Sequence, residues 1–164
     1  MIARSGRAIM LGVAVVSAAW LGGVALFGAV VAPAAFDVLP SRTLAGALVG
    51  RVLPALFISG IVVGLVVAAA AGSARSGRAR GWAVTAGASM VIACAAAQFL
   101  IGARIERVRA SASAPLDELP AGDPLRVTFG RLHGLSVAGL GVAAVAAGAA
   151  LVLLLRSSDD GTSG

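Results

Sequence analysis

The sequence has 164 residues, of which 59% are hydrophobic and only 12% are charged, and its mean hydropathy is +1.00. Soluble domains carry about 25% charged residues, so this composition excludes an ordinary soluble domain and predicts an integral membrane protein. The net charge of +6 comes from thirteen arginines without any lysine, and they lie almost wholly between the apolar runs. This placement is typical of side chains held at lipid headgroups, so we expect a lipid bilayer rather than nucleic acid as the partner.

The first apolar run covers residues 8–32 and contains no charged residue. It is long enough to cross about 30 Å of hydrocarbon as a helix, whereas a secretory signal has an apolar core of only ~7–15 residues. We therefore expect a retained membrane helix. Pro33 and Pro40 then bracket a short segment that contains Asp37. Because proline lacks a backbone donor and disfavours helix in the residue before it, we expect a turn or a short interfacial segment here.

The second predicted span covers the uncharged residues 52–72 and follows Ser41, a candidate helix cap. Arg51 has two interpretations. Its side chain either extends to the headgroups or faces inward and pairs with Asp37 or an acid of a later loop. A row of small residues on this span is expected to pack against a neighbouring helix of the same chain: Gly60, Gly64, Ala68 and Gly72.

The third predicted span covers residues 82–103 and follows a short basic loop at 73–81. Gln98, the only amide in the chain, is expected to face protein, where either a bond to another helix or a ligand would satisfy it. Good helix formers continue through residues 104–109, so this helix is expected to extend beyond the bilayer. The following segment, residues 110–124, is rich in proline, serine and acids and predicts a loop.

The fourth predicted span covers residues 132–155 after a short amphipathic approach at 126–131. The four spans predict an all-α integral membrane protein, a four-transmembrane-helix up-and-down bundle, with one membrane domain over residues 1–156. Residues 157–164 are expected to form a disordered tail. The first helix usually dominates orientation, so Arg4 and Arg7 favour both termini in the cytoplasm. We expect the protein to lie in the cell inner membrane.

Four short motifs carry a family resemblance. They are Val31-Ala32-Pro33 with Phe36, Ala45-Gly46 with Gly50, Arg104-Ile105 with Arg107, and Arg126-x-x-Phe129-Gly130-x-Leu132-His133-Gly134-x-Ser136. Together they resemble the bacterial domain of unknown function numbered 4149, which is similar to vertebrate transmembrane protein 205, over roughly residues 8 to 155. The resemblance implies a four-helix membrane protein without an assigned activity. An asparagine that often follows the family's His-Gly-x-Ser motif is absent here, where Ala138 and Gly139 stand.

The last of these motifs contains the only histidine of the chain, His133. Imidazole changes charge near neutral pH, and on a helix it would share one face with Phe129 and Ser136. The alternative is an interfacial packing residue. In an up-and-down bundle the first and third connections emerge at the same end, so we expect polar side chains from both to meet there. The predicted polar cluster comprises His133, Ser136, Arg131, Arg126, Arg104, Arg107, Glu106, Asp37 and Arg51.

Motifs for catalysis are absent from the sequence, which has no Cys-x-x-Cys, phosphate-binding loop, Ser-x-x-Lys or His-Glu-x-x-His pattern. One histidine and the single Cys94 offer few ligands for a transition metal. We therefore expect no enzyme, no cofactor and no metal. Three hypotheses remain: a protein for transport or tolerance of a small solute, an accessory or assembly subunit of a larger membrane complex or homo-oligomer joined through small-residue helix faces, and a haem- or quinone-associated electron-transfer component.

Overall fold

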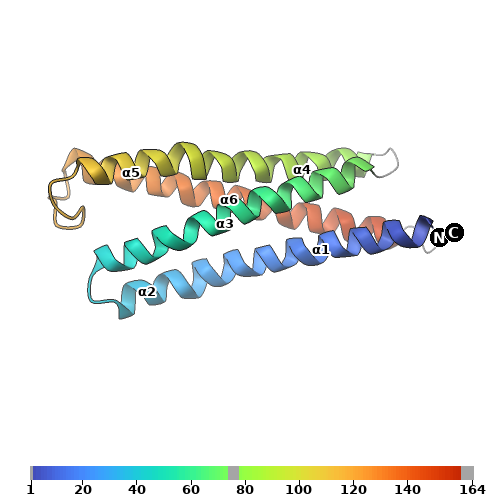
Figure 1. The fold of residues 1–164 in the computed structure, drawn as a ribbon, viewed down its shortest axis with the longest axis horizontal. Helices are drawn as coiled ribbons and strands as arrows, with labels where there is room; N and C mark the ends of the chain where they lie inside the picture. Colours follow the sequence, from blue (N-terminus) through green and yellow to red (C-terminus); the bar gives the residue numbers. More distant parts are fainter. Residues whose placement is uncertain (1, 74–77, 160–164) are drawn as a thin grey trace.

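The computed structural model describes residues 2–73 and 78–159, which form long helices joined by short connections (Figure 1). In chain order the elements are α1 (Ile2–Leu26), the π-helical turn η1 (Phe27–Val31), α2 (Ala32–Val38), α3 (Arg42–Ser73), α4 (Arg78–Ala95), the π-helical turn η2 (Ala96–Ile101), α5 (Gly102–Ser111) and α6 (Pro124–Asp159). Because α1, η1 and α2 follow one another without a break, as do α4, η2 and α5, the described residues form four continuous helical segments.

Each of these segments is long and apolar enough to cross a membrane, over Ala8–Val38, Arg42–Ser73, Ala79–Ser111 and Pro124–Arg156. Large apolar side chains on them point outward, with exposed fractions of 67% for Val15, 68% for Ile92 and 76% for Val145. An apolar surface of this extent needs hydrocarbon around it. The protein is therefore a multi-pass membrane protein, and the predicted fold class is confirmed.

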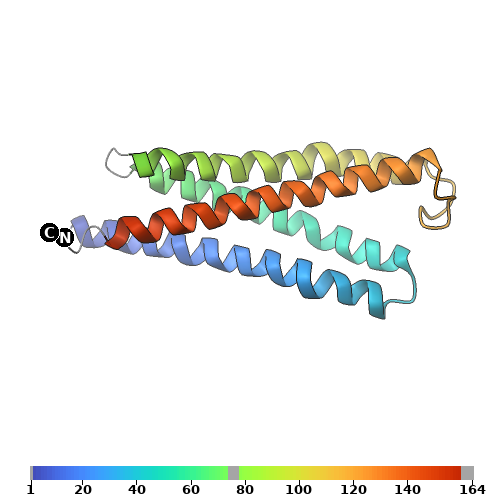
Figure 2. The same ribbon diagram turned by 180° about the vertical axis from the view of Figure 1, so that it is seen from behind.

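The four segments run up and down through the bundle, so that the start of α1 and the end of α6 lie at one end (Figures 1 and 2). The α2–α3 and α5–α6 connections lie at the opposite end. Along the chain α3 packs against α4 and α4 against α6, while α1 contacts both α3 and α6. At the end with these two connections, α2 and the first turns of α3 diverge from α5 and the first turns of α6 in both views.

The best-packed region lies where α3 crosses α4. A Cβ atom added at Gly64 would stand 2.8 Å from the carbonyl oxygen of Gly87, and one at Gly60 would stand 2.6 Å from the sulfur of Cys94. The two backbones approach this closely because neither glycine carries a side chain. Trp20 of α1 closes the same region and donates its indole N–H to the carbonyl of Leu56 at 3.1 Å. The small-residue row predicted on this span therefore packs within the chain at Gly60 and Gly64.

Of the turn or short interfacial segment predicted between Pro33 and Pro40, the turn is wrong, because α2 continues the first helix to Val38. A proline ring inside a helix clashes with the carbonyl four residues earlier, here Ala29. The π-helical turn η1 ends two residues before Pro33 and contains Ala29, and its wider turn relieves that clash. The chain stays helical until Leu39, whose backbone is extended.

The second and fourth helices are longer than predicted. The second begins at Arg42, directly after Ser41, whose hydroxyl accepts the backbone N–H of Leu44 at 3.2 Å as an N-cap. The fourth begins at Pro124, because Asp123 caps it by accepting the N–H of Leu125 at 2.8 Å. Proline suits a first helical position, where no backbone donor is needed.

The predicted boundaries at the other ends also change. The extension of the third helix beyond residue 103 is confirmed, since α5 ends at Ser111. The tail was predicted to be disordered from residue 157, but α6 continues past Arg156 and ends at Asp159. Residues 160–164 lie outside the described part of the chain, as do residues 74–77 of the predicted basic loop.

Candidate functional site

A cavity of about 810 Å³ lies between the α2–α3 side of the bundle and the η2–α5–α6 side. Ligand pockets commonly have volumes of about 300–1,000 Å³, so its size suits a small molecule. It follows the divergence of the helices at the end where the α2–α3 and α5–α6 connections emerge (Figure 1). The chain therefore leaves an open space between its helices at one membrane face, and the walls of that space decide what it can hold.

Polar side chains from all of these elements except α2 reach the cavity wall. They come from α3, from η2, from α5, from the connection at residues 112–123 and from α6. These residues are Arg42, Thr43, Gln98, Glu106, Arg109, Asp117, Arg126, His133 and Ser136. In a bundle whose other walls are apolar, this concentration of polar groups marks the cavity as the candidate site.

Arg109 is the residue that links the two sides of the cavity. Its Nη1 donates to Glu106 Oε1 at 3.0 Å, and its guanidinium carbon lies 5.4 Å from the ring centre of Phe129 on α6. A Cβ atom added at Gly50 of α3 would stand only 3.3 Å from the same Nη1. Arg109 therefore reaches from α5 across to α3, and the missing side chain at Gly50 gives its guanidinium room.

His133 stacks on Phe129, one helical turn earlier on α6. The two ring centres lie 6.1 Å apart and the planes differ by 11°. Ser136 is 4% exposed and lines the same cavity, so the ring, the imidazole and the hydroxyl share one face as their spacing predicted. The imidazole itself is exposed. Phe129 thus supports two planar cationic or ionisable groups, the guanidinium of Arg109 and the imidazole of His133.

The connection before α6 is tied to the start of α3. Thr43 Oγ1 donates to Asp117 Oδ1 at 2.6 Å, a contact between residues 74 positions apart in sequence. This hydrogen bond, together with nearby arginines, holds the pKa of Asp117 below its ordinary value. Arg126 donates from Nη1 to the backbone carbonyls of Asp117 at 3.4 Å and Leu119 at 2.5 Å. The connection is therefore held over the cavity mouth from both sides.

The sequence prediction placed nine residues in one cluster, and the structure brings His133, Ser136, Arg126 and Glu106 of them to the cavity wall. The other five are exposed side chains that do not line it: Asp37, Arg51, Arg104, Arg107 and Arg131. The reason is helical phase, since successive residues turn about 100° around the axis. Glu106 and Arg109 line the cavity from α5, and this phase turns Arg104 and Arg107 away from it.

Gln98 lies half-buried on the cavity wall within η2. Among the described residues no helix-to-helix hydrogen bond involves its side chain, so the cavity takes the place of the expected bond. A π-helical turn changes the phase of the residues after it, and such turns often occur at functional sites. Here η2 places Ala97, Gln98 and Phe99 on the cavity wall.

The wall becomes apolar away from the arginines. Leu53, Pro54 and Phe57 of α3 face Ala97 and Phe99 there. From Arg42 to Phe57 the lining of α3 covers about 22 Å at ~1.5 Å per residue, more than half of a ~30 Å hydrocarbon layer. The cavity is therefore amphipathic, with charged groups at the membrane face and apolar groups deeper in the bundle.

Sequence reasoning missed four members of the site. Arg109 was seen only as part of the helix expected to continue through residues 104–109, and Arg42, Thr43 and Asp117 were not placed in the cluster. The spacing of 106 and 109 on a helix was a usable signal for Arg109, because residues three apart share a face. The Thr43 contact depends on how the connection folds back over α3, which no local pattern predicts.

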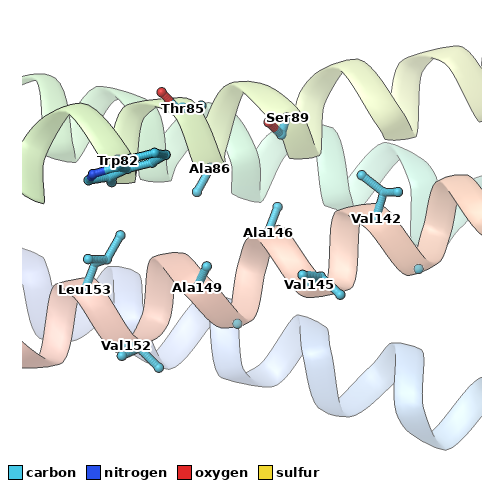
Figure 3. A pocket seen from close by; sticks show the side chains of 12 residues that line it. Trp82, Thr85, Ala86, Ser89, Val142, Val145, Ala146, Ala149, Val152 and Leu153 are labelled. Carbon is cyan, nitrogen blue, oxygen red and sulfur yellow. The ribbon is translucent and has the colours of Figure 1, made fainter.

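A second cavity, of about 870 Å³, opens between α4 and α6 near the other end of the bundle. Figure 3 shows Ala86 of α4 and Ala146 of α6 pointing toward one another there, with Trp82 at one side. Among the residues that the structure describes, no charged side chain lines it. Within the described residues, no three His, Cys, Asp or Glu side chains gather to hold a metal ion. The amphipathic cavity is thus the better candidate for a site.

Comparison with known proteins gives one match. A family model described as a domain of unknown function (DUF4149) matches residues 15–114 of the chain. The matched segment includes α1 from Val15 to Leu26, all of α3 and α4, and the α5 residues Glu106 and Arg109 of the cavity wall. No curated protein and no solved structure shows a significant match to the chain.

Proposed function

The chain belongs to the family of the domain of unknown function DUF4149, and from that premise and the amphipathic cavity we propose that it is a non-enzymatic membrane protein for transport or tolerance of a small solute. The observation that supports this most is the composition of one wall. The only histidine, the only amide and three arginines of a strongly apolar chain line a single cavity. Polar groups inside a membrane bundle are costly, and they commonly mark a solute pathway.

The proposal also states a direction in the membrane. The start of α1 and the end of α6 lie at the same end of the bundle (Figure 2). Arg4 and Arg7 precede the first span, and these support a cytoplasmic location for both termini. The cavity then opens toward the external side. A reporter fused after residue 164 should be active only in the cytoplasm, and activity only outside would reverse the orientation.

The accessory-subunit alternative has less support from packing. It relied on rows of small residues as contacts for other proteins, yet Gly60 and Gly64 are occupied by α4 of the same chain. A solute-binding role explains why polar side chains line the cavity, whereas an accessory role does not explain them. We therefore favour solute binding.

The test is to fill the cavity without disturbing the fold. Gly46 lines the cavity, and a Cβ atom added there would meet nothing within 4 Å, so Gly46→Leu can place a side chain in the space. Gly12→Leu is the matched control, because Gly12 is exposed on α1 and also has open space. Both proteins are purified in a neutral detergent, and their melting temperatures are measured with alkyl compounds that carry anionic, neutral or cationic headgroups.

A ligand that binds only the folded state raises the melting temperature. We expect at least one compound class to stabilise the wild-type protein and Gly12→Leu but not Gly46→Leu. A solute identified in this way is then tested for movement across proteoliposomes. If every compound acts equally on the wild type and on Gly46→Leu, the cavity binds none of them and the proposal is wrong.

A further inference from the structure

The cavity wall carries an excess of positive charge at the membrane face. Arg42, Arg109 and Arg126 line it from three different elements, against the two acids Glu106 and Asp117. Both acids are already engaged, since Asp117 accepts a hydrogen bond from Thr43 and Glu106 accepts one from Arg109. One net positive charge therefore remains at the mouth of the cavity, and it favours an anionic group there.

Arg109 has the geometry to hold such an anion. A guanidinium has five N–H donors in one plane, and Glu106 takes a bond from Nη1 only. Its guanidinium carbon lies over the Phe129 ring, 5.4 Å from the ring centre, so a cation–π contact holds the group at the cavity wall while other N–H donors stay available. The Glu106 side chain is 70% exposed, and an exposed ion pair of this kind is weak. A carboxylate or phosphate in the cavity can therefore take the place of Glu106 on Arg109, because breaking this weak ion pair costs little free energy.

The deeper wall requires an apolar partner. Leu53, Phe57 and Phe99 border the space beyond the arginines, and Gln98 is the one polar side chain among the η2 residues on the wall. A free inorganic anion would leave this part of the cavity without apolar contact. A molecule with an anionic headgroup and one alkyl chain would contact both regions of the wall. Its headgroup would bind the arginines, and its alkyl chain would pack against the apolar residues of α3.

We infer that the cavity binds a single-chain anionic amphiphile, an alkyl carboxylate or alkyl phosphate, with its headgroup on Arg109, Arg42 and Arg126 and its chain between Leu53, Phe57 and Phe99. This inference rests on the proposed solute-binding function and names its class of ligand. The carboxylate and the phosphate share the same recognition, because both accept bidentate hydrogen bonds from a guanidinium.

The experiment measures equilibrium binding of labelled dodecanoate to the full chain in phosphatidylcholine nanodiscs. Unlabelled dodecyl phosphate, dodecanol, dodecyltrimethylammonium and inorganic phosphate are the competitors. We expect dodecanoate and dodecyl phosphate to bind at least about tenfold more tightly than dodecanol, the difference that one charge-assisted hydrogen bond provides. Dodecyltrimethylammonium and inorganic phosphate should compete poorly, because one has the wrong charge and the other lacks the chain.

Two variants separate the headgroup contact from general effects. Arg109→Gln should weaken dodecanoate binding by about tenfold while leaving dodecanol binding unchanged. Arg131→Gln is the matched control, because Arg131 lies on α6 at the same face but outside the cavity, and it should bind dodecanoate as the wild type does. Equal loss in both variants would show that surface charge alone attracts the anion, and it would overturn the inference.

The remaining outcomes distinguish this inference from the proposed function. If Gly46→Leu abolishes binding of dodecanol or dodecyltrimethylammonium, and these bind the wild type as tightly as dodecanoate, the cavity binds solutes but the anionic class is wrong. If inorganic phosphate competes as well as dodecyl phosphate, the cavity does not recognise the alkyl chain of the ligand, and the inference is again overturned. If Gly46→Leu changes binding of no probe, both the inference and the proposed function fail.

Discussion

Replacing Gly64 by alanine should separate α3 from α4. The added Cβ would stand 2.8 Å from the Gly87 carbonyl oxygen and 2.9 Å from the Met90 Cβ. Ordinary contacts between carbon atoms are about 3.5–4.0 Å, so the helices must move apart by roughly 0.5–1 Å. A displacement of this size removes a quarter to a half of each affected contact energy, and overpacking of this kind typically costs about 1–3 kcal/mol.

The matched control is Gly72→Ala, in the same helix and the same row of small residues. A Cβ atom added at Gly72 meets nothing within 4 Å, so this variant gains helix propensity without a clash. Reversible unfolding in mixed neutral and anionic micelles, followed by tryptophan fluorescence, gives the free energy of unfolding of each variant. We expect Gly64→Ala to be less stable than Gly72→Ala by about 1–3 kcal/mol. Equal stabilities would refute the close approach of α3 and α4.

Three other substitutions test separate contacts. Gly50→Ala, whose new Cβ would stand 3.3 Å from Arg109 Nη1, should displace that guanidinium and weaken dodecanoate binding several-fold in the nanodisc assay; unchanged binding would show that Arg109 does not need this position. Thr43→Val removes a hydrogen bond to the ionised carboxylate of Asp117, so it should raise the depressed pKa of Asp117 toward the ordinary value of ~3.9. That hydrogen bond contributes stability above this pH, and the contribution is lost as the pH falls through the lowered pKa. The pKa is measured by titrating the carboxyl ¹³C shift of Asp117, and an unmoved pKa would contradict the prediction. Trp20→Phe should lose about 0.5–1.5 kcal/mol of stability in the micelle assay, because it removes the indole donor to α3, and no loss would show that this bond contributes nothing.

The number and order of the spans could be predicted from the sequence, because length and hydropathy alone set what crosses a membrane. The boundaries could not. The proline at position 33 indicates a turn in a soluble chain, but a backbone inside hydrocarbon must keep its hydrogen bonds, and the chain does so through the π-helical turn Phe27–Val31. Ser41, in contrast, was predicted as a cap and is one, because capping depends only on local backbone groups.

The candidate site was predictable only in part. Phe129, His133 and Ser136 could be placed on one face because their spacing follows the helix. The inward direction of Arg109 could not be chosen over that of Arg107 or Arg104, because the segment after residue 103 carries too little apolar pattern to fix its phase. The choice depends on how α5 packs against α6, and on Gly50 leaving room across the cavity.

The occupancy of the cavity can be measured most directly by photocrosslinking. A dodecanoate with a terminal diazirine, added to the full chain in phosphatidylcholine nanodiscs, is activated by light, and the labelled peptides are mapped by mass spectrometry. Binding in the cavity predicts adducts on Leu53, Phe57 and Ala97, with loss of these adducts in Gly46→Leu. Adducts confined to lipid-facing residues such as Ile92 and Val15, and equal in both proteins, would contradict it.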